Sequence, residues 1–126
     1  MATVAITTAP AISASAASCS PGFACGWSAN AFTGTQKSFY LNTEYWADYG
    51  FSNQANGIWA NGTSCGQTRF YDSEYALGNY ILLKSQSIYG TSYHDDVLDN
   101  GSPLGSGNTG DWDDKISTSW FTECNW

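Results

Sequence analysis

Positive charge is scarce in this chain, which has four Lys and Arg residues against eleven Asp and Glu residues and a formal net charge of −7. A protein that binds nucleic acid needs a basic surface to neutralise the phosphates. Four basic residues do not supply such a surface, so we expect no nucleic-acid partner. The acidic balance is instead compatible with a cation as ligand.

Long apolar runs are absent as well, since no stretch approaches the ~18 residues of a membrane-spanning helix, and we expect no membrane partner. Aromatic residues make up 16% of the chain and charged residues only 12%, which is not the composition of a disordered protein. With 126 residues, the chain has enough apolar mass for one core but not for two. We therefore expect a single folded domain, and a monomer.

The chain has one histidine and four cysteines. A structural zinc site is not expected, because closely spaced cysteine pairs are missing and one histidine does not complete the ligand set. An even number of cysteines in a short chain indicates two disulfides, and hence a secreted protein. Four cysteines allow three pairings. The short spacing favours Cys19 with Cys25, which leaves Cys65 with Cys124.

The first 18 residues read as a segment outside the fold. Val4–Ile12 is mildly apolar, and Ala14–Ala16 has the small-x-small form of a signal-peptidase site, although the basic start of a signal peptide is missing. We interpret the segment either as the remainder of an export signal or as a flexible arm. In both cases it lacks large side chains that would order it. The folded domain is predicted to span residues 19–126.

The aromatic pattern of this domain is duplicated. Trp27 and Phe70 lie 43 residues apart, and each is followed by a polar turn, a second aromatic residue and a glycine. A polar segment flanked by aromatic residues then follows in each copy, at residues 51–59 and 112–120. Such repetition indicates an architecture built from two similar units.

Short strands are the expected elements of both copies. Each opening reads as a β-hairpin whose glycine takes a positive φ and whose two aromatic rings meet. The segments 37–41, 57–59 and 80–83 are rich in aromatic and β-branched residues and are bounded by Gly, Asn and Ser. The pattern predicts an all-β sandwich or barrel with Greek-key connections.

The spacing of these residues resembles the Greek-key signature of the βγ-crystallin superfamily, in which an aromatic residue, four residues, a Phe or Tyr, one residue and a Gly follow one another. Trp27, Phe32 and Gly34 fit this signature without gaps. The second copy needs one inserted residue, because Gly78 follows Tyr75 one position late.

The resemblance implies a βγ-crystallin-like Greek-key β-sandwich with two duplicated Greek-key motifs, at about residues 19–62 and 63–126. Together with the opening segment Cys19–Trp27, the chain is most similar to a secreted bacterial branch that is grouped with metallopeptidase inhibitors.

The second polar motif, Asp113–Thr118, matches the calcium-binding motif of that superfamily except at its last residue. The resemblance implies that the side chains of Asp114 and Ser117 and the backbone of Lys115 bind Ca²⁺, together with the hairpin turn around Ser28 of the other copy. Ca²⁺ prefers several oxygen ligands in flexible geometry, and such a turn supplies part of the set. The alternative is that these residues only hydrogen-bond the turn.

The first polar motif, residues 52–57, offers no carboxylate, and a site there is less favoured. Six of the eleven acidic residues lie between Asp95 and Asp114, which gives the second copy a local negative field. We therefore predict one Ca²⁺ site of modest affinity, centred on Asp113, Asp114 and Ser117.

Peptidase inhibition is the function that the branch implies, because a loop held by a disulfide enters the cleft of a secreted peptidase with little loss of conformational entropy. We predict that the loops around Gly66, Gln67 and Thr68 and around Tyr45 and Trp46 make the contacts. The alternative for Trp46 is packing beneath its own loop.

The chain departs from the branch in one respect, because Cys65 has no second cysteine close behind it to close a short loop. Two further functional classes agree with the sequence. One is a calcium-binding structural or stress-related βγ-crystallin module, and the other is a secreted toxin-like or cell-wall-binding protein. An enzyme is not expected. His94, Asp95 and Asp96 have the pattern of a general base, but no nucleophile or metal partner accompanies them.

Overall fold

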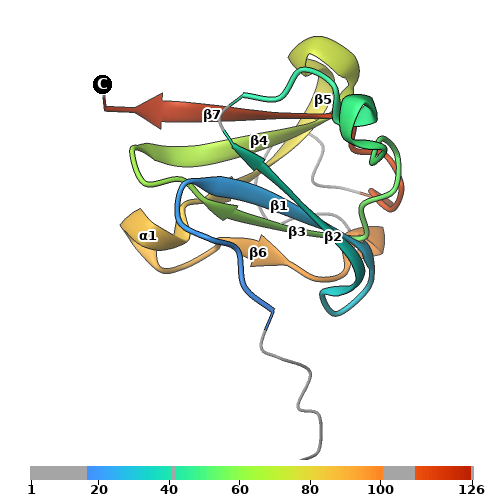
Figure 1. Ribbon diagram of the computed structural model, residues 1–126, viewed down its shortest axis with the longest axis horizontal. Helices are drawn as coiled ribbons and strands as arrows, with labels where there is room; N and C mark the ends of the chain where they lie inside the picture. Colours follow the sequence, from blue (N-terminus) through green and yellow to red (C-terminus); the bar gives the residue numbers. More distant parts are fainter. Residues whose placement is uncertain (1–16, 41, 101–109, 126) are drawn as a thin grey trace, which may run out of the picture.

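Two antiparallel sheets pack against each other in this protein (Figure 1). The computed structural model describes residues 17–40, 42–100 and 110–125. The first sheet has the strand order β2-β1-β3-β6 and consists of β1 (Phe23–Ala29), β2 (Thr33–Tyr40), β3 (Gly57–Asn61) and β6 (His94–Asp95). The second has the order β5-β4-β7 and consists of β4 (Cys65–Ser73), β5 (Leu77–Lys84) and β7 (Thr118–Cys124). The all-β prediction is confirmed.

The helical elements are single turns that connect the strands: η1 (Trp46–Tyr49), η2 (Glu74–Ala76), α1 (Gln86–Tyr89) and η3 (Leu98–Asn100). None of the helices in the described residues is long and apolar enough to cross a membrane.

The core lies between the sheets and is formed by alternate residues of the strands. In β1, Ala24 belongs to this core, while the next residue, Cys25, faces outward. In β3, Ile58 and Ala60 belong to the core, and Trp59 between them faces outward. Strand and motif residues of both halves lie in this core, namely Phe39, Phe70, Ile81, Leu83 and Ile116. They pack with further buried apolar residues, among them Trp46, Phe51, Leu98, Trp112 and Phe121.

A second apolar cluster covers the outer face of the first sheet. Trp27 and Trp59 are buried here with Cys19 and Cys25. The rings of Trp27 and Phe32 lie 4.9 Å apart at 63°, so the predicted aromatic contact in the first hairpin is confirmed.

Each half of the chain adds a strand or bridge to the sheet of the other half. β6, from the second half, pairs with β3 of the first half, where Ile58 lies opposite Asp95. In return, Thr43 of the first half bridges Ser119 in β7, through backbone hydrogen bonds of 2.9 and 3.2 Å. The two halves are therefore interlocked in the Greek-key manner that the duplication predicts.

The two hairpins are related by 44 residues, and not by the 43 that the aromatic residues indicate. In the first hairpin, Ser28 Oγ accepts a hydrogen bond from the backbone N–H of Thr35 at 2.8 Å. In the second, Asp72 Oδ1 accepts one from the backbone N–H of Asn79 at 3.1 Å. The two acceptors, Ser28 and Asp72, are 44 residues apart, and so are the two donors, Thr35 and Asn79.

The glycines of the signature confirm this register. Gly34 and Gly78 have φ values of +78° and +80°, and a Cβ at either position would collide with the acceptor oxygen of its own hairpin. Both positions therefore require glycine.

The counterpart of Trp27 in the second copy is thus Tyr71, and Ala76 stands where the first copy has Phe32. The inserted residue that the sequence comparison required does not exist. The prediction was wrong because Phe70, a core residue, lies directly before Tyr71 and offers an equally plausible aromatic opener.

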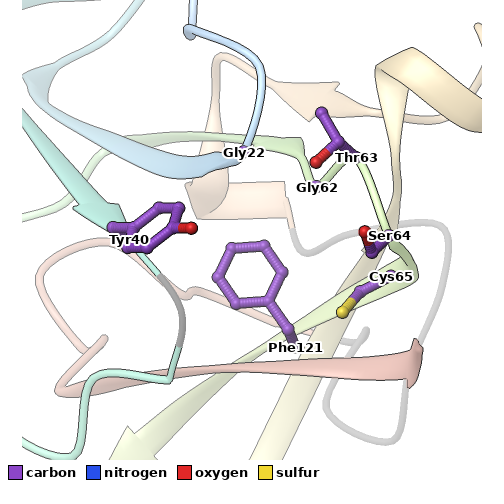
Figure 2. Close-up of a pocket in the computed structure, with 7 residues that line it drawn as sticks. All are labelled: Gly22, Tyr40, Gly62, Thr63, Ser64, Cys65 and Phe121. Carbon is purple, nitrogen blue, oxygen red and sulfur yellow. The ribbon is translucent and has the colours of Figure 1, made fainter. Parts of the chain in front are cut away.

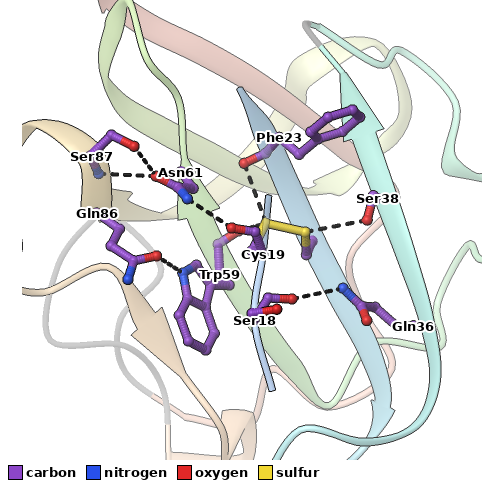
Figure 3. The surroundings of a disulfide bond; sticks show 10 residues. Ser18, Cys19, Phe23, Gln36, Ser38, Trp59, Asn61, Gln86 and Ser87 are labelled. Carbon is purple, nitrogen blue, oxygen red and sulfur yellow. Dashed lines mark hydrogen bonds between the residues drawn. A yellow bond between two sulfur atoms is a disulfide. The ribbon is translucent and has the colours of Figure 1, made fainter. Parts of the chain in front are cut away.

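Both predicted disulfides are present, Cys19–Cys25 and Cys65–Cys124. Cys65 and Cys124 are opposite residues of β4 and β7, so their bridge fastens the last strand to its sheet. The Cys19–Cys25 bridge ties the segment before β1 to the outer face of the first sheet (Figure 3).

This segment belongs to the folded part from Ala17 onward. Ser18 O accepts a hydrogen bond from Gln36 Nε2 at 3.0 Å, and Cys19 O accepts one from Asn61 Nδ2 at 2.7 Å (Figure 3). Ala17 packs against the outer cluster. The predicted boundary at residue 19 therefore leaves out two residues that make contacts. Residues 1–16, with the predicted cleavage motif, lie outside the described residues.

We expect the two disulfides to contribute unequally to the free energy of unfolding. The chain-entropy model gives about 4 kcal/mol for a bridge across 59 residues and about 2 kcal/mol for one across 6. The Cys65→Ala/Cys124→Ala variant should therefore lose about twice as much stability as Cys19→Ala/Cys25→Ala in urea unfolding followed by tryptophan fluorescence. Equal losses would show that packing of residues 17–20, and not loop closure, sets the contribution of the first bridge.

Candidate functional site

The two polar motifs contact each other through reciprocal backbone hydrogen bonds. The N–H of Asn53 donates to Ile116 O at 2.9 Å, and the N–H of Asp114 donates to Ala55 O at 3.1 Å. Asn53 and Asp114 both adopt positive φ, 56° and 58°. The motifs are thus related by 61 residues, as the aligned aromatic residues predict, and each completes the turn of the other.

Ser117, a predicted calcium ligand, is buried and faces the first motif. Its hydroxyl donates to Asn53 Oδ1 at 3.1 Å and accepts from Ser52 Oγ at 3.1 Å. The prediction grouped Ser117 with Asp114 and the turn around Ser28. No hydrogen bond in the described part of the chain joins these three residues, and Ser28 Oγ is used within its own hairpin.

Asn56 and Asp113 are the counterparts of Ser117 and Ser52 under the same relation. Each has a buried side-chain oxygen, Asn56 Oδ1 and Asp113 Oδ1, that has no hydrogen-bond partner in the described residues. Ser52 donates to Ser117, whereas Asn56 Oδ1 and Asp113 Oδ1 are both acceptors and each needs a donor from elsewhere. A buried acceptor without a donor costs about 1–3 kcal/mol. The position therefore calls for a positively charged or donating group.

Negative charge is concentrated at Asp113. Burial raises the pKa of its carboxyl above the ordinary value, and the charges of Asp111, Asp99 and Asp114 raise the pKa further. The ammonium group of Lys115 donates to the backbone carbonyl of Asp111. A cation bound here would offset the cost of burying the Asp113 carboxylate and the repulsion from the neighbouring carboxylates.

The ligand set would be mixed. No group of three or more His, Cys, Asp and Glu side chains within the described ranges is placed to hold a metal ion. Asp114 and Lys115 are exposed. A hard cation would thus need the amide oxygen of Asn56 and backbone oxygens beside the carboxylate of Asp113.

The sequence pattern did not single out Asn56 together with Asp113, because the first polar motif has no carboxylate and by itself predicts no cation site. The usable signal was the 61-residue offset, by which Asn56 and Asp113 correspond to Ser117 and Ser52, two residues that are hydrogen-bonded to each other.

The predicted binding loop at Gly66, Gln67 and Thr68 is a strand. These residues lie in β4, the middle strand of the second sheet, where Gln67 is paired with Lys84 on one side and Thr122 on the other. Thr68 is fully buried. The segment cannot protrude into a peptidase cleft, because both of its edges are already paired.

Trp46, the other predicted contact residue, is a core residue. Its ring stacks on Phe39 at 4.2 Å and 9°, and its indole N–H donates to Ser119 Oγ at 3.0 Å. Tyr45 is partly buried, and its ring meets Tyr75 at 4.6 Å. The alternative reading of Trp46 as a packing residue is therefore right.

His94 is exposed and has aromatic neighbours, since its ring lies 4.8 Å from Trp59 and 4.4 Å from Tyr93. Asp95 Oδ1 accepts a hydrogen bond from the backbone N–H of Val97 at 3.1 Å, and burial raises the pKa of this carboxyl. His94 and Asp95 thus form the short strand β6, and the Asp95 carboxylate hydrogen-bonds the segment that follows it.

A small cavity lies beside the Cys65–Cys124 bridge, with Phe121 between Tyr40 and Cys65 (Figure 2). Its volume is about 60 Å³. Ligand sites usually measure about 300–1,000 Å³, so this cavity has room for a few water molecules only.

No protein-family model and no curated protein matches the chain. Solved structures do match. A βγ-crystallin from Ciona intestinalis has 16% identity and a TM-score of 0.59, with 80% of this chain and 100% of that chain covered. A structure described as "Evolution of the eye lens beta-gamma-crystallin domain fold" has 14% identity and a TM-score of 0.61, with 82% of this chain and 89% of that chain covered. The similarity establishes a βγ-crystallin fold.

We expect Trp46→Ala to destabilise the fold strongly, because the substitution leaves a cavity beside Phe39. Removal of a buried tryptophan side chain costs about 3–5 kcal/mol. Tyr49→Ala is the matched control, since Tyr49 lies at the other end of η1 and is 53% exposed. Its free energy of unfolding, measured in urea, should change by about 1 kcal/mol or less. Similar losses in both variants would contradict the assignment of Trp46 to the core.

Proposed function

We propose that the protein is a secreted, non-enzymatic βγ-crystallin-like module that binds Ca²⁺ at the contact between its two polar motifs. The observation that carries the proposal is that the buried acceptor oxygens Asn56 Oδ1 and Asp113 Oδ1 have no hydrogen-bond donor among the residues that the structure describes. Two disulfides fit an extracellular setting, where Ca²⁺ is abundant enough for a site of modest affinity.

The donor types favour a hard cation. All four cysteines are in disulfides, so no thiolate is available to a soft metal. What remains at Asp113 is carboxylate, amide and backbone oxygen, the ligands that Ca²⁺ prefers. When bound, Ca²⁺ supplies positive charge to a buried acidic position and links the first motif to the second.

Calcium should raise the melting temperature of the protein, because it binds the folded state and not the unfolded one. At a concentration of ~100 Kd the stabilisation is about 2.7 kcal/mol. Asp113→Asn should abolish this response. In the absence of Ca²⁺, the same variant should be at least as stable as the wild type, because it removes the charge of a partly buried carboxylate that Asp111, Asp99 and Asp114 repel. Thermal melts with and without Ca²⁺ measure both effects.

Glu74→Gln is the control, because it removes one negative charge from an exposed position on η2. Its calcium response should equal that of the wild type. Mg²⁺ at the same ionic strength should have a smaller effect, since it requires a more regular ligand shell. If millimolar Ca²⁺ leaves the wild-type melting temperature unchanged, the buried oxygens are satisfied by water, and the calcium proposal fails.

Peptidase inhibition is the second candidate, and a different loop from the predicted one favours it. The connection between β3 and β4, residues 62–64, exposes Thr63 and Ser64. Its end is held by the Cys65–Cys124 bridge and by a hydrogen bond of 2.8 Å from the N–H of Asn125 to Ser64 O. A short loop fixed in this way loses little entropy when a cleft closes on it.

A panel of metallo-, serine and cysteine peptidases tests this candidate. If one is inhibited, Thr63→Ala/Ser64→Ala should weaken inhibition by roughly tenfold or more, as expected when contacts near the centre of an interface are removed. Thr91→Ala/Ser92→Ala, at an equally exposed Thr-Ser pair, should leave inhibition unchanged. If the Thr63→Ala/Ser64→Ala variant still inhibits as the wild type does, this loop is excluded as the contact. If no peptidase of the panel is inhibited, only the proposal of a calcium-binding module stands.

A further inference from the structure

An open groove of about 450 Å³ lies along the segment that leads from β2 into η1. Three tyrosines, Tyr40, Tyr45 and Tyr49, and two acidic residues, Glu44 and Asp48, line it. Tyr40 and Tyr49 are 62% and 53% exposed, so their rings are open to a ligand. The volume falls in the range of about 300–1,000 Å³ that small-ligand and side-chain pockets occupy.

The wall of this groove is held in place from below. Thr43 is joined to Ser119 of β7 by two backbone hydrogen bonds, and the N–H of Trp46 donates to Ser117 O at 3.0 Å. The Trp46 ring beneath the segment is stacked in the core on Phe39. A ligand would therefore meet a preformed surface and would not have to order a loop.

The acidic side chains of the groove have no counter-charge. Glu44 and Asp48 are exposed, and neither carboxylate has an ion-pair or hydrogen-bond partner in the described residues. None of the basic side chains of the chain lines the groove; they are Lys37, Arg69, Lys84 and Lys115. The groove therefore combines aromatic faces with uncompensated negative charge.

Two other tyrosines of the chain already contact basic side chains through their rings. The guanidinium of Arg69 lies 4.5 Å from the centre of the Tyr80 ring, and the ammonium of Lys84 lies 5.3 Å from that of Tyr89. Both distances are within the ~6 Å reach of a cation–π interaction. Among the described residues, the groove tyrosines Tyr40, Tyr45 and Tyr49 have no such cationic partner.

We infer that this groove binds a lysine- or arginine-bearing segment of another polypeptide. The basic side chain lies against the exposed faces of Tyr40 and Tyr49, and its charged head pairs with Glu44 or Asp48. The net charge of −7 draws such a segment toward the protein. This function is separate from calcium binding, since it uses neither Asn56 nor Asp113.

A neutral oligosaccharide is the competing ligand, because sugars also stack on tyrosine rings. It would leave the charges of Glu44 and Asp48 unpaired and would gain nothing from the net charge of the chain. Charge complementarity therefore favours the basic peptide segment.

The test is titration of a fluorescein-labelled hexapeptide of Arg and Lys with the full chain, followed by fluorescence anisotropy at physiological ionic strength. EDTA is present, so that the outcome does not depend on calcium. Glu44→Gln/Asp48→Asn is compared with Asp96→Asn/Glu123→Gln, which removes the same two charges from exposed positions outside the groove. Tyr49→Ala is compared with Tyr89→Ala, which has similar exposure.

The groove double variant should raise Kd by roughly tenfold or more, and the control pair by about twofold or less, because exposed charges outside the groove act only through the screened field. Tyr49→Ala should weaken binding severalfold, and Tyr89→Ala should not. Thermal melts confirm that each variant is folded. If both double variants lose the same affinity, binding depends on net charge alone, and the inference is overturned. Absence of saturable binding would overturn it too, as would a neutral hexasaccharide that binds in a Tyr49-dependent way.

Discussion

The exchange of backbone partners between the two halves of the chain is the constraint on which the rest of this structure depends. β6 closes one edge of the first sheet, and Thr43 extends the second by its bridge to Ser119. The polar motifs repeat the exchange through Asn53 and Asp114. Open sheet edges leave backbone groups unpaired, so each half needs the other to satisfy its own hydrogen bonds. Both proposed sites arise from this exchange, since one lies between the polar motifs and the other beside the segment that Thr43 anchors.

The local elements of the fold were predictable from the sequence because their signals are local. The hairpin at Trp27 is specified by a glycine that must adopt positive φ, and the Cys19–Cys25 bridge by its short spacing. The offset of the second hairpin was missed by one residue, since Phe70 and Tyr71 are both aromatic and only hydrogen bonding distinguishes them. Asp72 is the hydrogen-bond acceptor in the second hairpin, as Ser28 is in the first. A pattern built on aromatic residues does not reveal that a serine and an aspartate occupy the same position.

The candidate site was less predictable, because its pairs join residues about sixty positions apart. Ser117 bonds to Asn53, and Asn56 stands where Ser117 stands in the other copy. A motif that is read by itself contains only half of each pair. The predicted binding loops failed for a related reason. Gly66, Gln67 and Thr68 look like a loop by composition, but a strand that is paired on both sides tolerates polar residues. Trp46 looks exposed beside Tyr45, but an indole with a hydrogen-bond partner such as Ser119 can be fully buried.

The two cations that we propose as ligands differ because the two acidic regions differ in burial. Asn56 Oδ1 and Asp113 Oδ1 are shielded from water, so their partner must be small and must shed its hydration shell for oxygen ligands, as Ca²⁺ does. Glu44 and Asp48 are open to water and stand beside tyrosine rings. Aromatic faces hold weakly hydrated, polarisable cations, and guanidinium is more weakly hydrated than a metal ion or an ammonium group. A hydrated Ca²⁺ gains little from a tyrosine ring. The two proposed ligands therefore use different acidic residues and do not compete.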